Sequence, residues 1–135
     1  MQNKREIMQK ILILLIAIKQ FIKQYHWQAT SYQDHLLGDR LLEDIEDYID
    51  ETAELSVLFE GKEPLAASVL LGKASLYLSG KGNATLEEIA KAFGNLSDEL
   101  TRLSANTDDN GLKDLFGRLS NTVLRKLYLI QTQGK

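Results

Sequence analysis

Apolar residues recur at helical spacing along most of the chain. Residues 4–28 carry apolar side chains on more than one face of a helix, at Ile7, Ile11, Leu14, Leu15, Ile18 and Ile22. A helix that is apolar on several faces packs against several neighbours. The pattern therefore predicts a long first helix over residues 4–28.

Capping residues mark the beginnings of two further long helices. Ser31 is followed three residues later by Asp34, and Thr85 is followed three residues later by Glu88. A hydroxyl followed at this spacing by a carboxylate is typical of a helix N-terminus. We expect these two helices to extend over residues 31–60 and 85–104.

A fourth long helix is expected after the polar turn at residues 106–111. Apolar residues then repeat at helical spacing to residue 130, at Leu112, Leu115, Phe116, Leu119, Val123, Leu127 and Ile130. Residues 65–78 form a separate apolar segment. That segment predicts a short helix in the connection between the second and third long helices.

The expected breaks coincide with the single proline and with glycines, which disfavour a helix interior. These residues are Pro64, Gly61, Gly72, Gly80, Gly82 and Gly111. Two short loops flanking one long connection indicate an all-α fold, a ferritin-like four-helix bundle with a crossover that contains a short helix. With 135 residues, we expect one domain over residues 1–135.

Composition excludes several classes of function. The chain has no cysteine, so disulfide frameworks, thiolate metal sites and cysteine nucleophiles are excluded. Sixteen basic and 19 acidic residues give a net charge of -3, the wrong sign for gripping DNA by bulk charge. The longest apolar run, from Ile11 to Ile18, is too short to cross a bilayer. We expect a cytoplasmic protein that neither spans a membrane nor binds DNA.

Both histidines flank the junction of the first two helices. His26 lies near the end of the first helix and His35 in the first turn of the second, which then carries many carboxylates. On a continuous helix over residues 31–60, Asp39, Asp50 and Glu54 share one stripe with His35. A charge-rich stripe is also typical of a solvated face, and Glu43 and Glu46 fall on the same one.

Distances along that helix indicate a site shared between chains. Asp39 and Asp50 would be about 16 Å apart, and His35 and Glu54 about 30 Å apart, too far to hold one metal. Two copies related by a two-fold axis could bring the His35/Asp39 and Asp50/Glu54 pairs together, twice per dimer. Each pair has the i, i+4 spacing that places both side chains on one face.

The donor types limit the chemistry of such a site. Imidazole with carboxylates suits iron, manganese or zinc, and open positions would admit peroxide or oxygen. Intrachain di-iron bundles use Glu-x-x-His on two helices. Lys23 and Tyr32 stand three residues before His26 and His35, so that arrangement is absent.

These residues resemble the Dps-like miniferritins of the ferritin-like superfamily. The resemblance rests on His26-Trp27, on His35-x-x-x-Asp39 and, eleven residues later, on Asp50-x-x-x-Glu54. It implies a homo-oligomer, a dodecameric shell, that oxidises and stores iron under oxidative stress. DNA-binding members have longer lysine-rich tails than this chain, which begins with only Lys4 and Arg5 as basic residues.

The resemblance also implies roles for individual residues. His26, His35 and Asp39 of one subunit would bind iron together with Asp50 and Glu54 of its two-fold mate. Trp27 would lie beside the iron and could take up oxidising equivalents. The alternative is a non-catalytic, structural helical bundle that dimerises through residues 31–60 and keeps its carboxylates for solubility.

Overall fold

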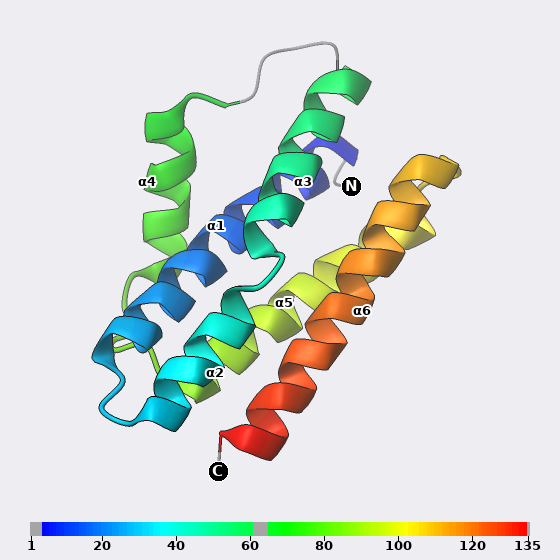
Figure 1. The fold of residues 1–135 in the computed structure, drawn as a ribbon. Helices are drawn as coiled ribbons and strands as arrows, with labels where there is room; N and C mark the ends of the chain where they lie inside the picture. Colours follow the sequence, from blue (N-terminus) through cyan, green and yellow to red (C-terminus); the bar gives the residue numbers. More distant parts are fainter. Residues whose placement is uncertain (1–3, 61–64, 135) are drawn as a thin grey trace.

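The computed structural model describes residues 4–60 and 65–134, and these residues form six α-helices without a strand (Figure 1). The prediction of an all-α fold is confirmed. The helices are α1 (Lys4–Gln28), α2 (Tyr32–Leu42), α3 (Ile45–Glu60), α4 (Ala67–Leu78), α5 (Leu86–Ala105) and α6 (Asn110–Gln133). Pro64 and Gly61, two of the predicted breaks, lie outside the described residues.

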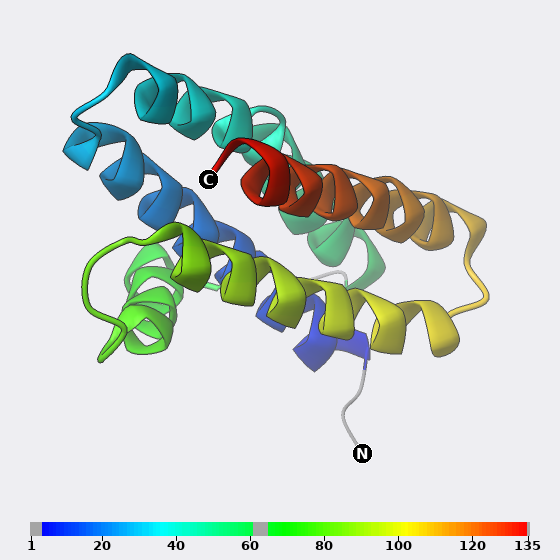
Figure 2. The same cartoon turned by 90° about the horizontal axis from the view of Figure 1, so that it is seen from below.

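The first helix is the centre of the arrangement. α1 packs against α2, α3, α4 and α5, while α6 packs against α5 and against α2 and α3. α1, α5, α6 and the α2/α3 pair therefore surround a common core, and α4 lies outside it on α1 (Figures 1 and 2). This is why α1 is apolar on several faces: Ile11, Leu15, Ile18 and Ile22 are all at most 1% exposed.

The predicted helix beginnings are confirmed by their caps. The Ser31 hydroxyl accepts a hydrogen bond from the backbone N–H of Asp34, and the Thr85 hydroxyl accepts one from that of Glu88, both at 3.1 Å. Each bond satisfies an N–H group that has no partner inside its helix. At α6 the same role falls to the Asp109 carboxylate, which accepts from the N–H of Leu112 at 2.9 Å.

The prediction of one helix over residues 31–60 is wrong. α2 ends at Leu42 and α3 begins at Ile45, and Asp44 between them has a φ of 69°. A left-handed residue cannot continue a right-handed helix, and aspartate is one of the few non-glycine residues that adopt this conformation. The chain therefore changes direction within the segment that was expected to carry a single stripe of ligands.

A buried lysine from α6 stabilises the break. Lys126 is 5% exposed, and its Nζ atom donates a hydrogen bond to the carbonyl oxygen of Arg40 at 3.0 Å. That carbonyl belongs to the last turn of α2, where it has lost its helical partner. Burial lowers the pKa of Lys126, although the nearby carboxylates of Asp44 and Glu43 act in the opposite direction.

Three of the glycines that were predicted to break a helix differ in their outcome. Gly80 and Gly82 have φ angles of 78° and 72° in the turn between α4 and α5, so the predicted break there is confirmed. Gly72 lies inside α4, and its predicted role as a helix break is wrong. A Cβ atom at Gly72 would meet nothing within 4 Å, because most of α4 faces away from the core and only Ala74 of this helix is fully buried.

Candidate metal centre

Three potential metal ligands converge where α1 meets α2. His26 comes from the last turn of α1, and His35 and Asp39 come from successive turns of α2. One possible ligand atom of each side chain lies within 4.8 Å of those of the other two. The chain turns back in the short connection before Ser31, the N-cap of α2, so that the beginning of α2 packs against the end of α1.

His26 is the most constrained member of this cluster. Its ring lies 3.9 Å from that of His35, centroid to centroid, with an interplanar angle of 32°. Its Nδ1 atom lies 3.0 Å from the carbonyl oxygen of His35 and 3.5 Å from Oδ1 of Asp39. Since a carbonyl can only accept, Nδ1 is the donor in this hydrogen bond, and Nε2 is the ring nitrogen that a metal could use.

The cluster is open on one side. The side chain of His26 is 17% exposed and that of Asp39 is 56% exposed, and His35 is also exposed. The His26 side chain is thus mostly buried and is hydrogen-bonded to the backbone of α2, while Asp39 faces solvent. A bound metal would have two imidazoles and one carboxylate as ligands and would keep positions for other groups.

Gly38 permits the close approach of the two helices and was missed by the sequence analysis. A Cβ atom at this position would lie 2.8 Å from the Cβ atom of His26 and 2.9 Å from its Nδ1 atom. Glycine in a helix interior costs about 1 kcal/mol relative to alanine. The sequence did offer a signal, a glycine inside the helix between His35 and Asp39. Because glycine destabilises a helix interior, its presence there indicates that a larger side chain would not fit.

Asp50 and Glu54 lie outside the cluster. Both are exposed on α3, beyond the break at Asp44. The structure therefore brings together three of the five predicted ligands, and the continuous helix on which the single stripe was based is interrupted at Asp44. The distances of about 16 and 30 Å that were based on that helix do not apply either.

Polar contacts hold α3 against α6. Both guanidinium Nη atoms of Arg118 contact the Glu51 carboxylate, and Arg118 Nε donates to Asp114 Oδ2 at 2.9 Å. The hydroxyl groups of Tyr48 and Thr122 are hydrogen-bonded at 3.0 Å. Asp50 and Glu54 are exposed on the same helix and so remain accessible to another molecule.

Trp27 follows His26 directly and is 67% exposed. Its large apolar surface is therefore not part of the core. Its expected role beside a metal stays a prediction.

The fold and the cluster define an all-helical protein with a candidate metal centre. A scan against models of protein families gave no match for this chain, and a search of curated proteins gave none either. No helix among residues 4–60 and 65–134 combines the length and the apolar character required to span a membrane.

Proposed function

We propose that this protein is a ferroxidase of the Dps-like miniferritin type, which oxidises ferrous iron and stores the product. In this proposal α1, α2 with α3, α5 and α6 are the members of a ferritin-like four-helix bundle, and α4 is the short helix of the crossover. The iron-oxidising activity in this proposal is inferred from the sequence resemblance. The convergence of His26, His35 and Asp39 is the single observation that carries the proposal, since these are the three ligands the resemblance assigns to one subunit.

Ferrous iron is the substrate. Two ferrous ions each lose one electron, and hydrogen peroxide accepts both electrons and two protons as its O–O bond breaks, which yields two ferric ions and two water molecules. With dioxygen as oxidant, the same two electrons and two protons yield hydrogen peroxide. Imidazole and carboxylate ligands tolerate both oxidation states of iron, and carboxylates favour the ferric product because it is the harder ion.

A second copy of the chain completes the site. Its Asp50 and Glu54 would face the His26, His35 and Asp39 cluster, and a two-fold axis would generate two equal sites per dimer. Both halves are accessible for this purpose: His35, Asp39, Asp50 and Glu54 are all exposed in the single chain. Trp27 would take up oxidising equivalents that escape the iron.

Mixing two inactive variants tests this arrangement. We expect His35→Ala/Asp39→Ala to be inactive, and Asp50→Ala/Glu54→Ala likewise, in an aerobic ferrous iron oxidation assay followed by ferric absorbance. When the two variants are unfolded together and refolded in equal amounts, half of the dimers are mixed, and each mixed dimer has one intact site. The mixture should therefore recover about one quarter of the wild-type rate.

Two controls make this test decisive. Each variant refolded alone should remain inactive, and the pair Asp98→Ala/Glu87→Ala, which removes two exposed carboxylates of α5, should keep full activity. A mixture as inactive as its parents would contradict the shared site. Wild-type protein that oxidises no iron above the buffer rate would contradict the ferroxidase and leave the structural bundle as the better description.

A further inference from the structure

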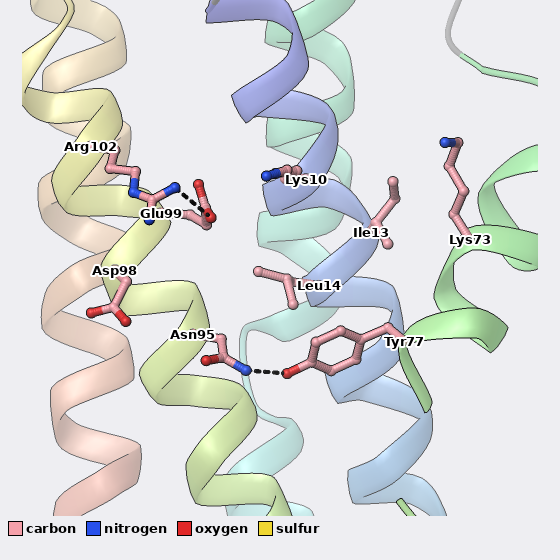
Figure 3. A pocket seen from close by; sticks show the side chains of 9 residues that line it. All are labelled: Lys10, Ile13, Leu14, Lys73, Tyr77, Asn95, Asp98, Glu99 and Arg102. Atoms are coloured by element: carbon pink, nitrogen blue, oxygen red, sulfur yellow. Dashed lines mark hydrogen bonds and ion pairs between the residues drawn. The ribbon is translucent and has the colours of Figure 1, made fainter. Parts of the chain in front are cut away.

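A second candidate site lies far from the metal centre, in a cleft between α1, α4 and α5 (Figure 3). The cleft has a volume of about 430 Å³. Lys10 and Leu14 line it from α1, about three helical turns or more before His26. Tyr77 of α4 crosses in front of α1, where its hydroxyl accepts a hydrogen bond from Asn95 of α5 at 2.6 Å, and this bridge closes one end of the cleft.

Glu99 lines the cleft, and one of its carboxylate oxygens has no partner. The Glu99 side chain is only 14% exposed, and its Oε1 atom lies 3.5 Å from Nη1 of Arg102. Its Oε2 atom is buried and has no hydrogen-bond partner among the described residues. An unpaired buried acceptor is unfavourable, most of all when it is charged. Because Oε2 itself has almost no surface open to the cleft, a donor that enters the cleft reaches this carboxylate through Oε1 or after the side chain turns.

The rim of the cleft has the opposite charge. Lys10, Lys73 and Arg102, one cation from each of the three helices, are all exposed there. Asp98 is the one exposed acidic side chain among the lining residues. Arg102 is ion-paired with Glu99, so Lys10 and Lys73 are the rim cations that attract anions, whereas the inner carboxylate attracts a cation. Apolar surface of Ile13 and Leu14 lies on the α1 wall between them.

We propose that this cleft binds a small zwitterion, in which an ammonium group on an apolar stem reaches Glu99 and a carboxylate stays at the lysines of the rim. A simple anion would leave the Glu99 oxygen unpaired, and a simple amine would leave Lys10 and Lys73 of the rim without an anion. A zwitterion satisfies both ends, and its methylene groups contact Leu14 and Ile13. This binding activity is additional to the proposed iron chemistry and uses none of its ligands.

Titration with three matched probes tests the proposal on the wild-type protein. The probes are ε-aminocaproate, caproate and n-hexylamine, which share one apolar stem and differ only in their charged ends. Shorter ω-amino acids, from glycine to γ-aminobutyrate, cover other spacings of the two charges. In ¹H–¹⁵N spectra we expect at least one ω-amino acid to bind saturably, with shifts at the cleft residues, and about tenfold more tightly than either single-charge probe.

Variants assign the two ends of the ligand. Glu99→Gln should weaken binding of the best ω-amino acid about tenfold and leave that of caproate unchanged, because only the ammonium contact is lost. Glu87→Gln is the matched control: it removes an exposed carboxylate of α5 outside the cleft and should change nothing. Lys10→Gln/Lys73→Gln should weaken the ω-amino acid and caproate but not hexylamine.

The comparison on wild-type protein keeps the proposal falsifiable even if Glu99→Gln does not fold. Caproate that binds as tightly as the best ω-amino acid would overturn it, since the inner carboxylate would then contribute nothing. The absence of any saturable shift at the cleft residues would overturn it equally.

Discussion

At the scale of single residues, a glycine and a tyrosine fix the end of α1 against α2. Gly38 lets the His26 side chain approach the backbone of α2. Tyr25, next to His26, lies beside the carboxylate of Asp34 in the first turn of α2, and this carboxylate contributes to the raised pKa of Tyr25. Neither residue is a proposed metal ligand, yet both hold the helix that carries His26 in place, and each can be tested separately.

Replacing Gly38 by alanine should damage the metal centre. The new methyl group would lie 2.8 Å from the Cβ atom of His26, so one helix must shift. We expect a loss of about 1–3 kcal/mol in the free energy of unfolding and about tenfold weaker binding of Co²⁺, followed by its visible absorbance without oxygen. Gly117→Ala on α6, where a Cβ atom meets nothing within 4 Å, should instead stabilise the protein by up to about 1 kcal/mol. Unchanged Co²⁺ affinity in Gly38→Ala would contradict the proposed cluster.

Tyr25 should make stability depend on alkaline pH. Burial, together with the neighbouring Asp34 carboxylate, raises the pKa of Tyr25 from 10.0 to about 12. The folded state thus favours the neutral phenol. This contribution to stability is complete below pH 10 and is lost as the pH rises from 10 to about 12. In urea unfolding across this range, Tyr25→Phe should lose less stability than the wild type does. Parallel curves for the two proteins would refute this linkage.

At the scale of the elements, the break between α2 and α3 decides where Asp50 and Glu54 lie. Asp44 supplies the left-handed residue, and Lys126 satisfies the carbonyl of Arg40. The position of the Asp50/Glu54 pair thus depends on the direction of α3 after the break. That direction is held in turn by the contacts of Glu51 and Tyr48 with α6.

Two substitutions at Asp44 distinguish a broken helix from a continuous one. Because its φ is 69°, Asp44→Gly should be more stable than Asp44→Ala by about 1 kcal/mol in urea unfolding, since alanine is strained in the left-handed region. Both variants remove the same charge, so each controls for the other. In a continuous helix the order would be reversed by a similar amount, because alanine is the better helix former.

At the scale of the whole molecule, the proposed function requires assembly. A single chain supplies two imidazoles and one carboxylate at the cluster, and in the proposed site the Asp50/Glu54 pair would come from another copy. Further apolar side chains are exposed on the outer helices, among them Leu71 and Leu76 of α4 at 62% and 76%. Apolar surface of this kind is typical of subunit contacts.

We expect light scattering to give a mass of about twelve times the 15.2 kDa of one chain. The variant Asp50→Ala/Glu54→Ala should keep this mass while it loses iron oxidation, because its substitutions remove metal ligands rather than apolar contacts. A protein that stays monomeric at micromolar concentration would contradict both the shell and the shared site.

Much of this molecule was predictable because its signals are local. The caps at Ser31 and Thr85 and the apolar period of α1 each depend on a few neighbouring residues. The meeting of His26 with His35 was predictable in part, since a short connection forces two successive helices to pack together. The position of Asp39 follows from its i, i+4 spacing to His35.

The amino-acid sequence by itself determined the all-α fold, the helix beginnings and the ligand types available to a metal. Only the tertiary structure decided that the second helix breaks at Asp44, since Lys126, which satisfies the freed carbonyl of Arg40, lies 86 residues away along the chain. Likewise, the need for Gly38 and the cleft around Glu99 arise from contacts between helices. Periodicity and capping report each helix separately, whereas packing depends on which surfaces meet.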